Sequence, residues 1–351
     1  MSLEDNIRKV VPYIPGEQPR NKVLKLNTNE CPYPPSPKVL KAMHSFDWKG
    51  LRLYPDPVMS DLIDSIASYY GVKPTEVFAG TGSDDVLSMC FLTFFAGDKP
   101  VLFPDITYSF YDVWAEVYRI PYITKELDKD FRIRAEDYMG ENGGIVIANP
   151  NAPTGISSGR DLLEEIIKNN RDSVVVVDEA YIDFGGESVL PLIEDYDNLI
   201  VVRTMSKSRA LAGMRIGYCF GCEKLIKYLN DVKYSVNSYT LNSPSIAAGK
   251  AAVEDEEYFR EIVGKTVATR QKTAEELKEL GWDVLPSDTN FLFASPPAGY
   301  DAGTIFEELK NRGIYVRHFN KKRITDHLRI SMGTDEQMSI FISTIKELTG
   351  K

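Results

Sequence analysis

The sequence predicts an α/β protein in which helices cover both faces of a mainly parallel sheet, followed by a smaller α+β domain. Five short apolar runs support this prediction, at residues 100–103, 144–148, 174–177, 199–202 and 215–220. Each run ends in polar or turn residues, and helical patterns lie between them. Runs that are apolar throughout are typical of strands buried on both faces. A chain of 351 residues is also too long to fold around one small hydrophobic core, so we expect two domains.

The first forty residues are expected to form an extended arm. They contain seven prolines, which fix φ and remove backbone donors. The last prolines of this group predict the start of a helix near residues 38–45. Apolar residues at helical spacing predict further helices over residues 61–70 and 84–95. The second of these is entered through the turn Gly80-Thr81-Gly82-Ser83.

Helical patterns return after the last run of the sheet, over residues 245–253 and 258–280. The longer one is amphipathic and is expected to link the two domains. The remaining pattern predicts strands at 290–294, 315–318 and 327–331, with helices at 302–312 and 335–348. We therefore expect an N-terminal arm over residues 1–40 that packs with the small domain, a large domain over 41–245 and a small domain over 246–351.

Charge and composition argue against several classes of partner. Acidic residues outnumber basic ones by 51 to 41, and no Lys/Arg-rich run occurs, which disfavours nucleic acid and anionic membranes as main partners. A small anionic substrate stays open, because a few buried arginines can override the global charge. The chain has no signal-like start and no apolar stretch of roughly 20 residues, so we expect neither secretion nor a membrane span.

The cysteines indicate a reducing, cytoplasmic setting, because four of them in a chain this long make no disulfide framework. Cys219 and Cys222 form a C-x2-C pair. A zinc site needs about four ligands, and no second pair exists. A redox motif is conceivable but has no support, so we interpret both as structural cysteines at the end of a strand and expect no metal.

Two residues that follow apolar runs are candidates for chemistry. Asp178 follows the run 174–177, where a charged acid is costly without a cationic partner. A pyridinium nitrogen would be such a partner; a helix cap or a structural ion pair is the alternative. Lys207, between Ser206 and Ser208, follows the run 199–202 and is a candidate Schiff-base former. Alone it would be read as a surface lysine.

Three further segments could hold a phosphate or orient a ring. Arg215 stands eight residues after Lys207, between small residues and a strand, and suits a phosphate. The backbone N–H groups at Ser83 and Asp84 open a helix and could cradle the same group, although such turns are common. In the segment 149–155 two prolines and a glycine preset the direction of an asparagine; an ordinary turn is the alternative.

Together these segments resemble the class I/II aminotransferases of fold type I, which use pyridoxal phosphate (PLP), and most closely the histidinol-phosphate aminotransferases. The motifs are Asn-Pro-Asn-x-Pro-Thr-Gly at 149–155, Asp-Glu-Ala-Tyr at 178–181, Ser-Lys-Ser at 206–208 and Gly-x-Arg-x-Gly at 213–217. The resemblance extends to Leu-Asn-Thr-Asn-Glu at 26–30 and Leu-Arg-Ile-Ser-Met-Gly-Thr at 328–334. It implies the three-layer PLP-dependent transferase fold type I for the large domain, with a smaller α+β domain.

The resemblance also implies roles around the cofactor. Lys207 would hold PLP as a Schiff base and move the proton, and Asp178 would pair with the pyridine nitrogen. Tyr181 would hydrogen-bond the phenolic oxygen of the ring, and Tyr108 would stack on the ring. The residues implied for the phosphate are Ser83, Asp84, Ser206, Arg215 and, from a neighbouring subunit, Tyr54. The last of these implies an obligate homodimer.

Four residues are implied as substrate ligands: Arg329, Arg317, Tyr13 of the arm and Asn290. For Arg317 a surface ion pair is the alternative. The chain departs from the family at two places. The asparagine usual before Pro-Thr-Gly is Ala152, so either the turn presents Asn151 to the ring oxygen or Tyr181 makes that contact alone. Arg209 stands where the family often has phenylalanine, and we expect it to add a cation near the lysine or the phosphate.

The resemblance implies reversible amino transfer from L-histidinol phosphate to 2-oxoglutarate, which gives imidazole acetol phosphate and L-glutamate in histidine biosynthesis. The cofactor motifs do not separate this activity from an aromatic amino-acid aminotransferase or a phospho-amino-acid decarboxylase on the same fold. A PLP-binding regulatory domain is disfavoured, since the chain has no room for a DNA-binding module.

Overall fold

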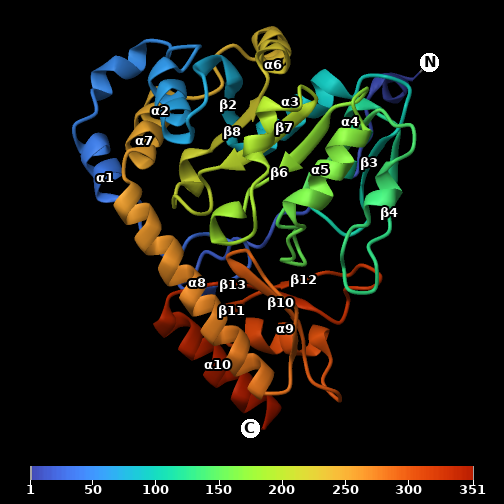
Figure 1. The fold of residues 1–351 in the computed structure, drawn as a ribbon. Helices are drawn as coiled ribbons and strands as arrows, with labels where there is room; N and C mark the ends of the chain where they lie inside the picture. Colours follow the sequence, from blue (N-terminus) through green and yellow to red (C-terminus); the bar gives the residue numbers. More distant parts are fainter. Residues whose placement is uncertain (1, 351) are drawn as a thin grey trace.

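A seven-stranded sheet forms the centre of the large domain in the computed structural model, which describes residues 2–350 (Figure 1). In spatial order its strands are β2 (Val77–Thr81), β8 (Ile216–Gly221), β7 (Leu199–Thr204), β6 (Val175–Asp178), β5 (Gly144–Ala148), β3 (Val101–Pro104) and β4 (Tyr122–Lys125). Strand β8 runs in the opposite direction to the other six strands. The predicted α/β class with a mainly parallel sheet is confirmed, and the five apolar runs are β3, β5, β6, β7 and β8.

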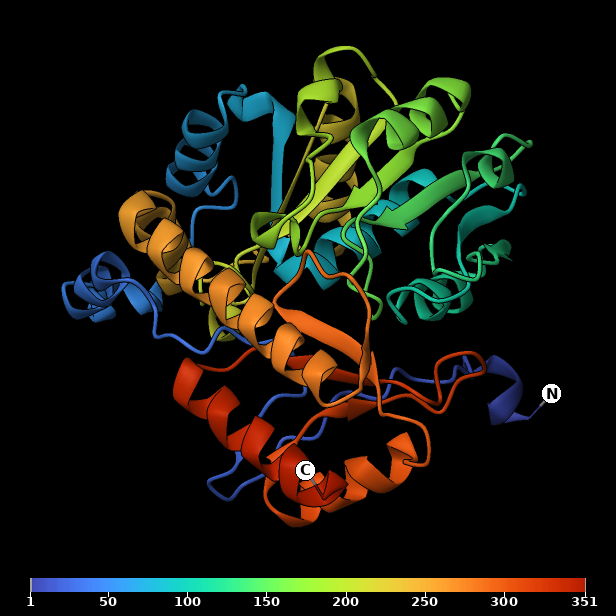
Figure 2. The same ribbon diagram turned by 60° about the horizontal axis from the view of Figure 1, so that its bottom comes forward.

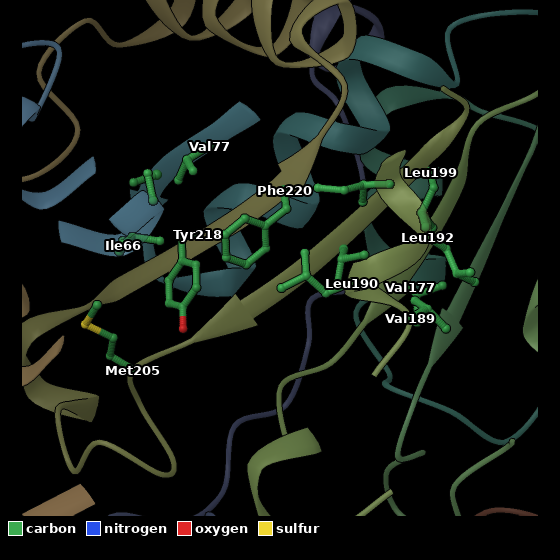
Figure 3. Close-up of a cluster of buried hydrophobic side chains, with 14 of the residues drawn as sticks. Ile66, Val77, Val177, Val189, Leu190, Leu192, Leu199, Met205, Tyr218 and Phe220 are labelled. Atoms are coloured by element: carbon green, nitrogen blue, oxygen red, sulfur yellow. The ribbon is translucent and has the colours of Figure 1, made fainter. Parts of the chain in front are cut away.

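Helices cover both faces of this sheet, which makes three layers. Alternate residues of β6 show the division, because Val175 and Val177 join one core while Val176 joins the other. The first core packs under α1 (Pro37–His44), α2 (Ser60–Tyr70), α5 (Arg160–Asn169) and α7 (Ser243–Val253). The second packs under α3 (Gly82–Phe94), α4 (Tyr111–Tyr118) and α6 (Glu223–Val236). Figure 3 shows part of the first core, with Tyr218 and Phe220 of β8 near side chains of segment 189–192.

The small domain is an antiparallel sheet packed against helices. Helix α8 (Glu256–Glu279) leads into it from the large domain (Figure 1). The sheet has the order β12 (Arg317–His318), β13 (Leu328–Ser331), β10 (Phe291–Ser295) and β9 (Asp283–Val284), with α9 (Ala302–Asn311) and α10 (Asp335–Thr349) beside it (Figure 2). The single strand predicted at 315–318 is two short ones, because β11 (Ile314–Tyr315) pairs with the arm and β12 pairs with β13.

The N-terminal arm contacts both domains. Its early part follows the large domain, where Arg8 donates to the carbonyl of Val117. Its later part lies on the small domain, where β1 (Leu24–Lys25) pairs with β11 and Glu17 lies 2.7 Å from Lys310. Helix α7 packs against α1 and α2. The domain limits at residues 40 and 245 stay a prediction.

Short 3-10 helices join several of these elements: η1 (Leu3–Asn6), η2 (Trp48–Arg52), η3 (Pro74–Glu76), η4 (Ala135–Tyr138), η5 (Ile182–Phe184), η6 (Leu190–Glu194) and η7 (Ala212–Met214). Across residues 2–350, no helix combines the length and apolar character that crossing a bilayer requires. Cys219 is buried in β8 and Cys222 follows that strand at the start of α6, both as free cysteines.

Candidate active site

A cavity of about 380 Å³ opens at the carboxyl ends of the central strands. The carboxyl ends of neighbouring parallel strands meet at one edge of a sheet, which is where ligands bind in such folds. Residues far apart in the sequence therefore converge here. The cavity is lined by these sequence-predicted residues: Ser83, Asp84, Tyr108, Asp178, Tyr181, Ser206, Lys207 and Arg215.

Asp178 is a buried carboxylate at the end of β6. Its Oδ2 accepts a hydrogen bond from the hydroxyl of Tyr111 at 2.9 Å, and its Oδ1 accepts one from the N–H of Ala180 at 3.1 Å. Burial raises the pKa of Asp178 to about 6. Among residues 2–350, Asp178 makes no ion pair and is not the N-cap of the helix that follows it. It therefore has no cationic partner within the described chain. A charged ring nitrogen in the cavity would provide that cation.

Tyr111 was not singled out from the sequence. It is fully buried in α4, and burial beside Asp178 raises the pKa of its hydroxyl well above the ordinary value. The phenol therefore stays neutral and donates to the carboxylate. The available signal was its position three residues after Tyr108, which places both rings on one side of the start of α4.

Lys207 lies just beyond β7 and points into the cavity. Its Nζ donates to the carbonyl of Thr28 at 3.2 Å and lies 5.7 Å from the centre of the Tyr181 ring. The hydroxyl of Tyr181 accepts from Nδ2 of Asn29 at 2.9 Å. The amine has no carboxylate partner among the residues that the structure describes. It is therefore placed to react with a carbonyl group in the cavity.

The other end of the cavity has the features of a phosphate site. The guanidinium of Arg215 lies against Gly82, where an added Cβ would stand 2.6 Å from Nη2. Its Nη2 donates to Oδ2 of Asp84 at 3.1 Å, and Tyr108 donates to Oδ1 of the same carboxylate at 2.7 Å. Ser206 and the N-terminus of α3 complete the wall. A helix N-terminus, a hydroxyl and a guanidinium together suit a phosphate.

Gly217, the last glycine of the Gly-x-Arg-x-Gly motif, allows a close approach of two backbone segments. A Cβ at this position would lie 2.2 Å from the carbonyl carbon of Gly82. Only glycine lets β8 approach the start of α3 so closely. This approach brings Arg215 to the helix N-terminus, so the motif's spacing follows from the packing.

Asn151 and Tyr54 are not brought to the cavity. The amide of Asn151 is used within the chain, since Nδ2 donates to the carbonyl of Ile106 at 2.9 Å and Oδ1 accepts from Thr107 at 2.8 Å. Ala152 lines the cavity in its place. The turn therefore does not present Asn151 to the cavity, which leaves Tyr181 as the residue predicted to contact the ring oxygen. Tyr54 is 81% exposed and stacks on Tyr239 with ring centres 4.6 Å apart.

The expectation that Arg209 adds a cation near the lysine or the phosphate is wrong. Its Nη1 donates to the carbonyl of Ala252 at 2.5 Å, near the carboxyl end of α7. Its guanidinium lies 4.1 Å from the Phe259 ring centre and 4.8 Å from that of Tyr69. Helix carboxyl ends and aromatic faces both attract cations, so Arg209 turns away from the cavity.

Two arginines stand side by side on the small domain. Arg317 of β12 is opposite Arg329 of β13 in the strand register. Arg317 donates to the carbonyls of Ile14 at 3.0 Å and Pro15 at 3.4 Å, so the surface ion pair considered for it is wrong. Arg329 donates to the carbonyl of Asn27 at 3.0 Å.

Neither arginine pairs with a carboxylate within residues 2–350. Burial lowers the pKa of Arg329, and its Nε is buried without a hydrogen-bond partner. Two adjacent cations without counter-charge suit an anionic ligand, which would relieve both their repulsion and their desolvation.

Of the other two predicted substrate ligands, Tyr13 lines a pocket together with Arg317. Tyr13 stacks on Phe110 with ring centres 4.2 Å apart. Asn290 donates from Nδ2 to the carbonyl of Asn29 at 2.9 Å, and its Oδ1 is buried without a partner. Through Asn29, Asn290 supports Tyr181.

Comparison with known proteins decides the family. The model of the family "Aminotransferase class I and II" matches residues 21–345. The chain belongs to this family. The aminotransferase is 50% identical over 348 residues to a histidinol-phosphate aminotransferase of Clostridium botulinum (strain 657 / Type Ba4), covering 99% of this chain and 98% of the relative. It is also 50% identical to the enzyme of that name from Lactococcus lactis subsp. cremoris (strain SK11), with the same coverage.

A solved structure supports both the fold and the cofactor. The crystal structure of histidinol-phosphate aminotransferase from Sinorhizobium meliloti, in complex with pyridoxal-5'-phosphate, superposes with a TM-score of 0.85 at 25% identity, covering 94% of this chain and 92% of the other. The predicted fold type I and the predicted cofactor, PLP, are confirmed. The unpaired carboxylate of Asp178 and the cradle around Arg215 fit the two ends of this cofactor.

Proposed function

We propose that this aminotransferase transfers the amino group of L-histidinol phosphate to 2-oxoglutarate, giving imidazole acetol phosphate and L-glutamate in histidine biosynthesis. The observation that carries the proposal is the arginine pair without counter-charge, Arg317 and Arg329, in a chain that is 50% identical over its full length to histidinol-phosphate aminotransferases. Both substrates are anionic, through a phosphate or through carboxylates. A ping-pong path would use one anion site for both in turn.

The residues around the cavity would divide the work as follows. PLP, when bound, supplies an electron-withdrawing ring that lowers the cost of removing the substrate's Cα proton. Lys207 would hold the cofactor and afterwards move the proton. Its amine donates to the carbonyl of Thr28 and has no carboxylate partner in the described chain, so it is free to react. Asp178 would keep the ring nitrogen charged, and Tyr111 would keep Asp178 oriented.

The other contacts would orient the cofactor and the substrate. Tyr181, fixed by Asn29, would donate its hydroxyl proton to the ring oxygen, and Tyr108 would stack on the ring face. The backbone N–H groups of Ser83 and Asp84, the hydroxyl of Ser206 and the guanidinium of Arg215 would bind the phosphate of PLP. Tyr13 of the arm and Asn290 would close the substrate side near Arg329.

We also propose a homodimer in which Tyr54 completes the phosphate site of the partner. Tyr54 stacks on Tyr239 yet leaves most of its side chain exposed, and the residues that follow it are hydrogen-bonded. The buried Lys233 donates to the carbonyl of Pro57 at 3.0 Å, and Asp56 accepts from the N–H groups of Val58 and Ser60. A rigid loop with an exposed tyrosine suits a contact across an interface. The four free cysteines support a reducing, cytoplasmic setting.

Half-reaction spectra test the substrate. The holoenzyme is mixed, without 2-oxoglutarate, with histidinol phosphate, phenylalanine, tyrosine or threonine phosphate, and the visible cofactor band is followed. Loss of the band with histidinol phosphate alone supports the proposal. Preference for phenylalanine would indicate an aromatic aminotransferase, and carbon dioxide release from threonine phosphate would indicate a decarboxylase.

A further inference from the structure

The loop between β12 and β13 reaches across to the large domain through one arginine. Arg323 donates from Nη1 to Oδ2 of Asp105 at 3.0 Å. Its Nη2 donates to the carbonyls of Leu127 at 2.7 Å and Asp128 at 2.8 Å. In the same loop Nζ of Lys321 donates to the carbonyl of Asp105 at 2.6 Å. This cluster, which we call the Arg323 latch, joins two domains by charge-assisted hydrogen bonds.

The latch is built at some conformational cost. Arg323 has a φ of +74°, in the left-handed region that a residue with a Cβ rarely adopts. The side chains of Arg323 and Asp105 are only about a quarter exposed, at 24% and 26%. Ile324 is buried beside Ile106 and Leu127 in a small core that spans both domains. A strained residue persists when its surroundings hold it, so these contacts fix the conformation of the loop.

On the large-domain side, the latch is anchored at Asp105. Asp105 follows the last residue of β3 and stands three residues before Tyr108. Its second carboxylate oxygen, Oδ1, accepts from the N–H of Leu127 at 2.9 Å, so both oxygens are occupied. The carboxylate is therefore held in one orientation, in which Oδ2 faces the guanidinium of Arg323.

On the small-domain side, the latch acts on the strands that carry the arginine pair. The loop begins after β12, which holds Arg317, and ends at β13, which holds Arg329. Arg323 stands only six residues before Arg329. The latch therefore ties the arginine pair to the rim of the cavity in which Lys207 lies.

We propose that Arg323 is a positioning residue that holds the small domain so that Arg317 and Arg329 face the cavity of Lys207. This inference rests on the proposed function, since it assigns the arginine pair to the substrate. The residues proposed for the cofactor have their own supports within the large domain. Lys207, Asp178 and Arg215 belong to that domain, and Tyr108 is held there by its hydrogen bond to Asp84. Loss of the latch loosens substrate binding and leaves cofactor binding unchanged.

The test compares Arg323→Met with Arg323→Lys and with a matched control, Arg312→Met. Arg312 pairs with Glu308 one turn away on α9, within the small domain. We expect Arg323→Met to raise KM for both substrates by about tenfold, as expected for losing a charge-assisted contact. We expect kcat to change less, and the cofactor's visible band and dissociation constant to stay within about twofold. Arg323→Lys keeps the charge, so its KM should lie between those of the wild type and Arg323→Met. The KM of Arg312→Met should match that of the wild type.

A double-mutant cycle with Asp105→Asn shows whether the effect passes through this contact. The inference requires that Asp105→Asn add little to Arg323→Met. An unchanged KM in both Arg323 variants would overturn it, as would a parallel loss of cofactor affinity or fully additive effects. Failure of the proposed function appears separately, as a wild type that does not transaminate histidinol phosphate; KM is then measured with the donor that bleaches the band.

Discussion

Replacing Asp178 with asparagine should stabilise the protein freed of cofactor while weakening its hold on the cofactor. Burial raises the pKa of Asp178 from the ordinary 3.8 to about 6, so ionising it in the folded chain costs about 3 kcal/mol more than in the unfolded chain. Asparagine removes this cost. It keeps the acceptor for Tyr111 but loses the bond from the N–H of Ala180, worth about 1 kcal/mol. The net gain in the free energy of unfolding is about 2 kcal/mol at pH 8.

The sign of this effect depends on pH in a defined way. The pKa of Asp178 is raised on folding, so the folded state binds the proton more tightly, and the wild type loses stability as pH rises from about 4 to about 6. At pH 5 the folded carboxyl is largely protonated, and the advantage of asparagine shrinks to about 0.5 kcal/mol.

Urea unfolding of the cofactor-free proteins measures both values, at one protein concentration and at pH 8 and pH 5. Asp64→Asn, which alters an exposed aspartate of α2, is the control and should leave stability unchanged. The cofactor-loaded Asp178→Asn protein should be less stable relative to wild type, since the ring nitrogen loses its counter-charge. A less stable cofactor-free variant at pH 8, or an advantage independent of pH, would refute the reasoning.

Three further substitutions probe separate parts of the site. Arg329→Met should raise KM for both substrates by a factor of about 100, because a buried cation that binds the anion is lost. Steady-state kinetics measure this KM, and the visible cofactor band should stay unchanged. An unchanged KM would exclude Arg329 as an anion ligand. Tyr111→Phe removes one hydrogen bond from Asp178, so cofactor affinity should fall about fivefold to tenfold in a spectroscopic titration, and a wild-type affinity would show that Asp178 needs no orienting phenol. Tyr54→Phe should weaken cofactor binding about tenfold, and refolding it together with Lys207→Ala should restore some wild-type sites if Tyr54 acts across a dimer; absence of any recovery would place Tyr54 elsewhere.

Much of the large domain was predictable because its strands are buried on both faces. Runs such as 144–148 and 199–202 are apolar throughout and are confirmed as β5 and β7. The edge strand β4 was missed, because two of its four residues are exposed and leave no apolar run. The break between β11 and β12 could not be seen either, because it depends on the arm as a pairing partner.

The site was predictable where a motif fixes the backbone and not where distant side chains compete. Lys207 and Asp178 were each placed after a strand and Arg215 just before one, and the fold brings all three to one cavity. Arg209 turned to a helix end and two aromatic rings that no local pattern announces. Tyr111 carries no motif, and its role follows only from the burial that makes Asp178 need a donor.

The most direct measurement is the spectrum and turnover of Lys207→Ala loaded with PLP. Lys207 should be the residue that both holds the cofactor and moves the proton, so the variant should lack the visible band of the lysine-bound cofactor. Its turnover of histidinol phosphate should fall by at least about a thousandfold, as expected for loss of a nucleophile that is also the acid and base. A variant that kept the band and turned over at a rate near that of the wild type would contradict the assignment of Lys207.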